Sequence, residues 1–190
     1  MIGVLALQGG VREHVEALSM LGVKAIEVKT PEQLSGLNGL VIPGGESTNL
    51  RKLIARFGLK EKIVLEHEKG MALFGTCAGA IVLSKKIEGE KPFIPALGVT
   101  AKRNSYGRQL DSFEAMVSVK GIGKDFPAVF IRAPEFTAPE KSVEVLAEFN
   151  GKPVLLREGN VLLSSFHPEL TKDTRVHELF LKIAGEKKKK

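Results

Sequence analysis

The chain has 190 residues, of which 43% are hydrophobic and 26% are charged. This length is typical of one domain with a sizeable core, and the composition excludes wholesale disorder. The only cysteine excludes an internal disulfide and any multi-cysteine metal site. The net charge of +6 falls to +2, from 24 basic and 22 acidic residues, when the four terminal lysines are omitted. The basic balance therefore lies mostly in the tail and does not indicate a nucleic-acid-binding surface.

The first half of the chain alternates strand and helix patterns. Apolar runs predict strands over Met1–Leu7, Ala25–Val28, Leu40–Ile42 and Met71–Phe74. Apolar residues three or four positions apart predict helices over Val11–Leu21, Thr48–Arg56 and Leu59–Lys69. This alternation is typical of a parallel sheet with helices on both faces. The N-terminal apolar run is too short to span a membrane and has no basic region before it, so we expect neither a membrane segment nor a signal peptide.

The second half contains short strand-like runs separated by turns. They are Ala115–Val119, Val129–Ala133, Val143–Phe149, Pro153–Arg157 and Val161–Ser164. The dipeptide Asn150-Gly151 between two of them is typical of a hairpin turn. A final amphipathic helix is predicted over Lys172–Ala184. The sequence therefore predicts one α/β domain over residues 1–186, with a mixed and mostly parallel sheet flanked by helices, and a disordered basic tail over residues 187–190.

The lone cysteine lies in the motif Gly75-Thr76-Cys77-Ala78-Gly79, between a predicted strand and a helix. This is the nucleophile-elbow pattern with sulfur in place of oxygen. Its small residues allow a tight turn, and the helix start favours the thiolate form of Cys77. The N–H group of Ala78 can then bind a developing oxyanion. A lone cysteine is usually a small buried hydrophobic residue, but within this motif a nucleophile is the favoured interpretation.

Four histidines are candidate bases for this thiol. His14, His67 and His177 lie in helix patterns, where we expect solvated or half-buried faces. His167 instead follows an apolar strand, in the segment Ser164-Ser-Phe-His-Pro-Glu169. Residues two apart in an extended segment project to the same side, so Glu169 can orient the His167 ring. The alternative is a strand-end turn with incidental charges, but the position of His167 downstream of an elbow cysteine favours a catalytic pair.

Two further features are candidate ligand contacts. The segment Pro43–Thr48 has adjacent glycines after a strand, and such a turn lets backbone N–H groups approach a ligand closely. Gly9-Gly10 does not indicate a dinucleotide site, because no G-x-G-x-x-G pattern is present. Arg103 and Arg132 lie in loop or strand-end settings, where each either holds a substrate carboxylate or is exposed without a specific contact.

Together these segments resemble the class I, triad-type glutamine amidotransferases. Further motifs narrow the resemblance to the glutaminase subunits of pyridoxal 5'-phosphate synthases, and it covers nearly the whole chain. These motifs are Leu5–Gly9, Glu13-His14, Pro43–Thr48, Gly75–Gly79, Arg103–Gln109, Asp111–Glu114 and Phe130–Pro134.

The resemblance implies a three-layer, flavodoxin-like fold and a glutaminase activity. Cys77 would attack the side-chain amide of L-glutamine and form a thioester, with His167 and Glu169 as its partners, so that glutamate and ammonia are released. The oxyanion would be held by backbone N–H groups at Gly45 and Ala78. The residues expected to hold glutamine are Gly45, Glu46, Ser47, Arg103, Ile131 and Arg132. Neither a cofactor nor a metal is expected, and the location implied is cytoplasmic.

The resemblance also implies a partner. Ammonia would pass to a (β/α)₈ synthase subunit in a hetero-oligomer, and the glutaminase would be poorly active until that subunit docks. Because Gln8, Gly9 and Gly10 end the first strand beside the predicted oxyanion loop, we infer that they relay docking. No nucleic acid or membrane is expected as a partner.

Two alternatives remain from the sequence. The first is another cysteine hydrolase with a similar elbow, of the peptidase or deglycase type. The terminal His-x-Glu and the Gly-Gly-Glu-Ser loop disfavour it. The second is a non-catalytic regulatory or ligand-binding homologue, and the presence of all three triad residues disfavours that reading.

Overall fold

The structure is a computed structural model that describes residues 1–103 and 112–185. The lysine tail at 187–190 and the motif residues 104–109 and 111 lie outside the described residues. In the two described ranges, no helix is long and apolar enough to cross a membrane. The assignment of residues 1–186 to a single domain stays a prediction.

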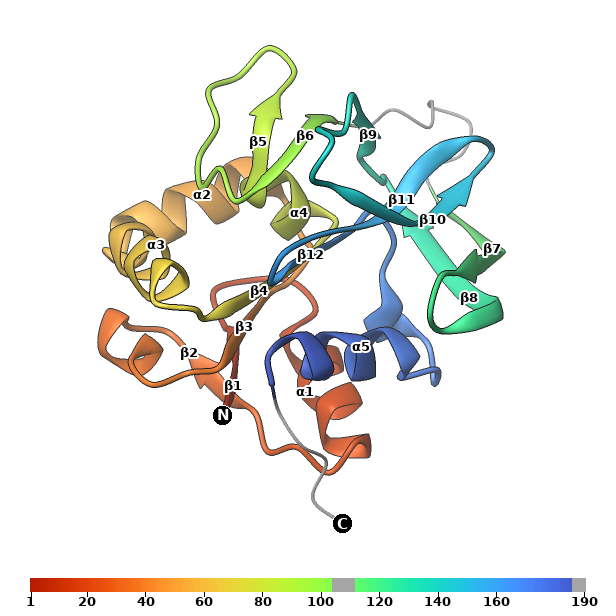
Figure 1. The fold of residues 1–190 in the computed structure, drawn as a ribbon. Coiled ribbons are helices and arrows are strands. Elements are labelled where there is room, and N and C mark those ends of the chain that lie inside the picture. Colours follow the sequence, from red (N-terminus) through yellow and green to blue (C-terminus); the bar gives the residue numbers. More distant parts are fainter. Residues whose placement is uncertain (104–111, 186–190) are drawn as a thin grey trace.

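A seven-stranded sheet forms the centre of the fold (Figure 1). Its strands are β1 (Ile2–Leu5), β2 (Ile26–Val28), β3 (Gly39–Ile42), β4 (Ala72–Thr76), β10 (Glu144–Phe149), β11 (Lys152–Glu158) and β12 (Val161–Ser164). The strand order is β10-β11-β12-β4-β3-β1-β2. The five strands from β12 to β2 run parallel, and β11 and β10 continue the sheet antiparallel. The predicted mixed and mostly parallel sheet is confirmed.

Helices cover both faces of this sheet (Figure 1). On one side lie α2 (Ser47–Arg56), α3 (Leu59–Glu68) and α4 (Ala78–Leu83), and on the other lie α1 (Val11–Met20) and α5 (Arg175–Ile183). Two 3₁₀ turns, η1 (Pro31–Leu34) and η2 (Pro168–Leu170), complete the helical elements of the described residues.

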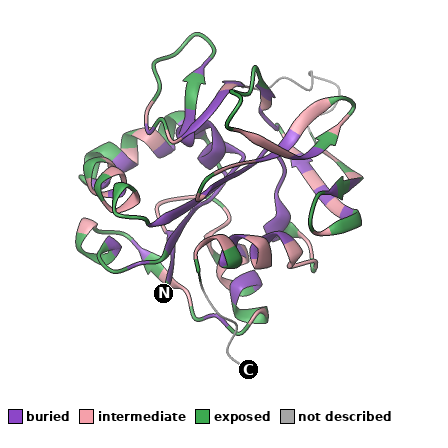
Figure 2. Cartoon of the chain, viewed as in Figure 1, coloured by how far each residue is buried: buried purple, intermediate pink, exposed green. Residues whose placement is uncertain are grey.

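Alternate strand residues supply the two cores between these layers. In β3, Leu40 and Ile42 join the cluster that contains α2 and α3 residues, whereas Val41 joins the cluster that contains α1 and α5 residues. The central strands are buried on both faces (Figure 2), which explains their continuous apolar runs.

The second half also forms two smaller sheets. One contains β5 (Ser84–Ile87), β6 (Leu97–Lys102) and β9 (Glu135–Thr137), and the other pairs β7 (Ser112–Val119) with β8 (Gly123–Ile131). The sequence patterns did not predict β5, β6 or β9, since β5 has the polar sequence Ser-Lys-Lys-Ile and β9 is three residues long. The predicted hairpin at Asn150-Gly151 is confirmed, because both residues have positive φ (51° and 72°) between antiparallel β10 and β11.

The parallel strands bring four segments to one edge of the sheet. Their carboxyl ends lead into Gln8 after β1, Gly44 after β3, Cys77 after β4 and His167 after β12. In open parallel sheets this edge is where ligands bind. The topology therefore gathers the sequence-predicted residues at one place.

Candidate active site

Cys77 occupies a strained turn between β4 and α4. Its backbone has φ 48° and ψ −104°, a conformation that residues other than glycine rarely adopt. The turn works only with small neighbours, because a Cβ added at Gly79 would lie 1.9 Å from the carbonyl oxygen of Ile42. Strain of this kind is typical of nucleophile elbows, and it presents the sulfur at the end of the sheet.

His167 and Glu169 form a buried pair. Nδ1 of His167 lies 2.8 Å from Oε1 of Glu169, and the Glu169 side chain is only 1% exposed. The sequence predicted that these two side chains pair, but the extended conformation expected for the segment is wrong. Pro168–Leu170 form a 3₁₀ turn rather than an extended segment, so the turn and not strand alternation brings the carboxylate back to the ring.

The nucleophile and this pair converge on the loop after β3. A Cβ at Gly44 would lie 2.5 Å from Cε1 of His167 and 3.3 Å from Cβ of Cys77. Only a glycine therefore allows this loop to pass so close to both side chains.

The charges of the pair differ from those of free side chains. Burial opposes a charged His167 ring, but hydrogen bonding to Cys77 and to Glu169 outweighs burial and raises the pKa of His167 to about 10. Burial also opposes a charged Glu169, but the hydrogen bond from His167 and the attraction of that charged ring outweigh burial and lower the pKa of Glu169. Near neutral pH the site therefore holds an imidazolium paired with a carboxylate.

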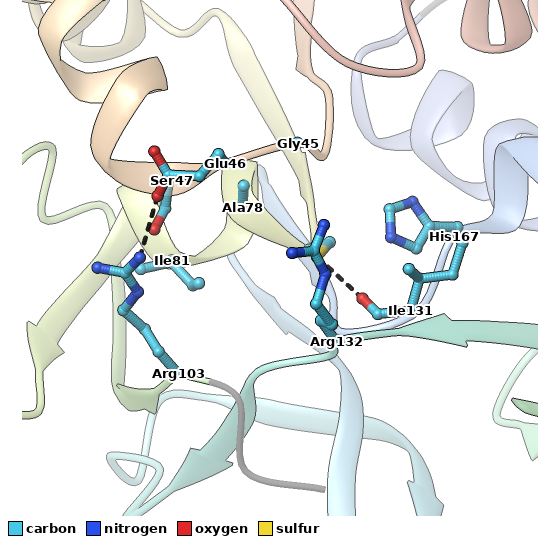
Figure 3. A pocket seen from close by; sticks show the side chains of 10 residues that line it. Gly45, Glu46, Ser47, Ala78, Ile81, Arg103, Ile131, Arg132 and His167 are labelled. Atoms are coloured by element: carbon cyan, nitrogen blue, oxygen red, sulfur yellow. Dashed lines mark hydrogen bonds and ion pairs between the residues drawn. The ribbon is translucent and has the colours of Figure 1, made fainter. Parts of the chain in front are cut away.

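A pocket opens over the sulfur, and most of the sequence-predicted site residues line it (Figure 3). The lining residues are Gly45, Glu46, Ser47, Cys77, Ala78, Ile81, Arg103, Ile131, Arg132 and His167. Figure 3 shows Arg103 beside Glu46 and Ser47 at one end and His167 at the other. Sequence reasoning missed Ile81, whose place one helical turn after Cys77 was the available signal.

The wall opposite the elbow comes from the end of β8. Sγ of Cys77 lies 3.7 Å from the carbonyl oxygen of Ile131, as the dashed line in Figure 3 marks. The next residue, Arg132, has φ 42° and is exposed at the pocket. Cys77 and Arg132 thus place two strained backbones at one pocket, which is typical of functional sites.

Glu46 caps α2 and at the same time holds Arg103. Its carboxylate accepts hydrogen bonds from the N–H groups of Thr48 (2.9 Å) and Asn49 (2.7 Å). These backbone donors, with the Arg103 charge, keep the pKa of Glu46 below its ordinary value despite opposing desolvation. Arg103 also donates to Glu90 at 2.8 Å. Glu46 therefore acts on the pocket partly through Arg103.

The segment after β1 lies against the same loop but does not line the pocket. Nε2 of Gln8 donates to the carbonyl oxygen of Glu46 at 2.7 Å. A Cβ at Gly9 would lie 1.6 Å from the carbonyl oxygen of Gly44, and one at Gly10 would lie 3.2 Å from Oε1 of Glu169. Gln8 and Gly9 of the predicted relay thus lie against the loop, and Gly10 lies next to Glu169 of the buried pair.

Two other histidines are not where the sequence placed them. His14 and His177 are fully buried, whereas we expected solvated or half-buried faces. His67 is half-buried, as expected. The signal was available, because His14 lies three residues after Val11 and four before Leu18, on the apolar face of α1. Buried polar rings need partners, and His14 and His177 find them in each other.

A parallel sheet that ends in a strained cysteine beside a charged histidine is the arrangement of a cysteine-dependent hydrolase or amide transferase. Comparison with known proteins specifies the class. The model of the SNO glutamine amidotransferase family matches residues 4–186. The chain belongs to this family.

Individual relatives are similar over almost the whole chain. Pyridoxal 5'-phosphate synthase subunit PdxT of Geobacillus kaustophilus is 51% identical over 188 residues, which cover 98% of this chain and 96% of that protein. The subunit of the same name from Thermus thermophilus is 52% identical over 187 residues, which cover 97% of each chain. A crystal structure of a glutamine amidotransferase has a TM-score of 0.93 and 51% identity, and covers 97% of this chain and 98% of the other. The expected fold is thereby confirmed.

Proposed function

We propose that this chain is the glutaminase subunit of a pyridoxal 5'-phosphate synthase and hydrolyses L-glutamine to glutamate and ammonia. The observation that carries the proposal is the convergence of Cys77, His167 and Gly44 at one end of the sheet, over a pocket. Its support in sequence is about 50% identity to relatives named as subunits of that synthase, over nearly their full length. The peptidase, deglycase and non-catalytic alternatives are not favoured.

The first chemical half forms a thioester. The sulfur of Cys77, whose proton has already passed to His167, attacks the side-chain amide carbon of glutamine, and the amide C–N bond then breaks. The nitrogen leaves as ammonia after it takes a proton from His167. The raised pKa of His167 keeps this ring protonated at neutral pH, so the proton is available. Glu169 stabilises the imidazolium before the transfer and keeps the ring oriented after it.

The second half releases glutamate. His167, now neutral, removes a proton from water, and the resulting hydroxide attacks the thioester carbon. The C–S bond breaks, glutamate leaves and the sulfur of Cys77 is free for the next turnover. Each half passes through an oxyanion, for which we propose the N–H groups of Gly45 and Ala78 as donors. Ala78 is the first residue of α4, and a first-turn N–H has no acceptor inside its own helix.

The pocket walls fit an α-amino acid. We propose that Arg103 and Arg132 supply positive charge for the α-carboxylate, and that the carbonyl oxygen of Ile131 accepts an N–H of glutamine. Ser47, a buried residue at the start of α2, and Gly45 complete the wall around the reacting end. Glu46 contributes by holding Arg103 and capping α2.

A synthase partner follows from the relatives' name as one subunit of a pyridoxal 5'-phosphate synthase. We propose that this partner is a (β/α)₈ subunit and takes up the ammonia. The contacts of Gln8 and Gly9 with the Gly44–Glu46 loop support a relay from the docking face to the oxyanion loop. A cytoplasmic location stays an expectation from the resemblance.

The experiment is a glutaminase assay of the chain with and without its synthase partner, with ammonia release as the measurement. We expect release that depends on the partner and that Cys77→Ala abolishes. Full hydrolysis by Cys77→Ala would refute the proposal. Since Cys77 is the only cysteine, labelling by a glutamine-analogue electrophile gives a second measurement, and labelling of any other residue would contradict the mechanism.

A further inference from the structure

His14 is buried at the back of the active site and has no part in the chemistry above. Its side chain is 0% exposed, and both ring nitrogens make contacts. Nδ1 lies 3.0 Å from Nε2 of His177 in α5. Nε2 lies 3.2 Å from Oγ1 of Thr76 and 3.5 Å from Oε2 of Glu169. The ring therefore connects α5, the residue before the nucleophile, and the carboxylate of the catalytic pair.

The surroundings of this cluster are apolar and buried. The Phe74 ring packs edge-on against His14 and His177, with centroids 6.1 and 5.9 Å away. Burial lowers the pKa of His14 and of His177, so both rings are neutral near pH 7. Each ring then has one N–H donor and one bare nitrogen.

Two arrangements of these protons are possible, and they differ in what they leave unsatisfied. With a proton on Nδ1 of His14, the bare Nε2 would face the carboxylate of Glu169, and Nδ1–H of His177 would be a buried donor without a partner among the described residues. With the proton on Nε2, His14 donates toward Thr76 and Glu169, and Nε2–H of His177 donates to Nδ1 of His14. The first arrangement combines an unpaired buried donor on His177 with repulsion between the bare Nε2 of His14 and the carboxylate of Glu169. Both are costly, so the second arrangement is favoured.

In that arrangement His14 contacts both halves of the catalytic apparatus. Oε1 of Glu169 takes the His167 hydrogen bond, and Oε2, which has no hydrogen bond within the described residues, faces His14. Thr76 in turn accepts the N–H of Gly44 at 3.1 Å, in the loop proposed to form the oxyanion hole. The buried His14 ring thus restrains the Glu169 carboxylate directly and the Gly44 loop through the Thr76 hydroxyl.

We propose that His14 is a positioning residue for glutamine hydrolysis, which fixes the Glu169 carboxylate and the Thr76 hydroxyl relative to each other, with His177 fixing the His14 tautomer. This inference rests on the proposed glutaminase function. It predicts a loss in turnover rather than in substrate affinity, because neither His14 nor His177 lines the pocket.

The test compares two substitutions of His14, by glutamine and by asparagine, in the glutaminase assay with the synthase partner present. In His14→Gln the amide nitrogen replaces Nε2 and keeps the donor toward Thr76 and Glu169. In His14→Asn it replaces Nδ1 and reaches only His177. We expect His14→Asn to lower kcat on the order of 10- to 100-fold with KM within about twofold, as small misplacements of catalytic groups do, and His14→Gln to recover most of kcat.

A matched control is His67→Gln, since His67 lies in α3 and contacts the carbonyl oxygen of Met71 at 2.8 Å, away from the pocket. We expect it to leave kcat unchanged. If the His14 variants do not fold, His177→Leu and His177→Gln make the same comparison one step away, with kcat lowered in the first and recovered in the second.

The outcomes separate the two claims. An active wild type with unchanged kcat in His14→Asn, or with equal losses in the asparagine and glutamine variants, would overturn the positioning role alone. The same results in the His177 pair would do so as well. A wild type that releases no ammonia with its partner present would overturn the proposed function, and the positioning role with it.

Discussion

Two clusters of ionisable side chains lie beside the same pocket, and they differ mainly in burial. The inner cluster joins His167, Glu169 and His14, and the latter two side chains are at most 1% exposed. The outer cluster joins Glu46, Glu90 and Arg103, with side chains 31–54% exposed. Both clusters consist of short ion pairs and hydrogen bonds, so the contact distances alone do not distinguish them.

Burial changes what such contacts can do. In the inner cluster, burial by itself opposes both charges, but hydrogen bonding outweighs burial. The pKa of His167 is therefore raised and that of Glu169 lowered, and the close packing fixes the geometry. In the outer cluster water and salt screen the charges, so Arg103 can exchange Glu90 or Glu46 for a substrate carboxylate at little cost. We therefore expect the inner cluster to set turnover and the outer cluster to set substrate binding.

The largest expected effect comes from removing the inner negative charge. In Glu169→Gln the shape is kept, but the imidazolium of His167 loses its anionic partner. We expect kcat to fall on the order of 10²- to 10⁴-fold, with KM little changed, as for loss of the acidic member of other triads. Steady-state glutaminase kinetics with the partner present measures both constants. If the substitution changed mainly KM, it would contradict the assignment of turnover to the inner cluster and of substrate binding to the outer cluster.

A smaller effect is expected from the outer cation. Arg103→Gln should raise KM for glutamine on the order of 10-fold and leave kcat within about threefold, because one charge-assisted contact to the substrate is lost. Arg51→Gln is the matched control, since Arg51 pairs with Glu90 but does not line the pocket. Equal changes in KM for the two variants would show that the outer cluster acts only as a structural unit.

The inner cluster should also make stability depend on pH. The folded-state pKa of His167 is raised from 6.5 to about 10, so its stabilisation is fully present below pH 6.5 and is lost as pH rises through 10. We therefore expect the difference in unfolding free energy between wild type and His167→Gln to be greatest at about pH 6 and to shrink by about pH 10. Urea unfolding at several pH values measures it, and a difference that grows with pH would contradict the assigned charge state.

The smallest effect belongs to Glu90. Its hydrogen bond from Arg103 lowers the pKa of the Glu90 carboxyl, but this carboxylate is one-third exposed. Glu90→Gln should cost less than about 1 kcal/mol in unfolding free energy, and added salt should reduce the difference further. A loss that persists in high salt would place Glu90 with the buried cluster rather than the exposed one.

Local patterns in the sequence predicted the parts of the site that depend on nearby residues. The elbow around Cys77 needs small residues within two positions, and Gly79 is one that the structure shows to be indispensable for close packing. His167 and Glu169 are two residues apart, so their pairing was accessible as well, although through a 3₁₀ turn that the pattern did not reveal. The alternation of strands and helices likewise predicted the parallel sheet.

Other features depend on contacts between distant positions, which no local pattern encodes. His14 and His177 are 163 positions apart, and their burial follows from the packing of α1 and α5 on one face of the sheet. Arg103 contacts Glu46 because β6 ends and α2 begins near the same pocket, and β9 forms a strand by pairing with β6.

The sequence by itself predicted a nucleophile, its histidine–glutamate pair and the order of the central elements, since these follow from spacing and periodicity. The tertiary structure decided which of the remaining charged groups are buried, because burial depends on neighbours supplied by the whole fold. Burial in turn decides which charges are held for catalysis and which remain free to exchange with a substrate.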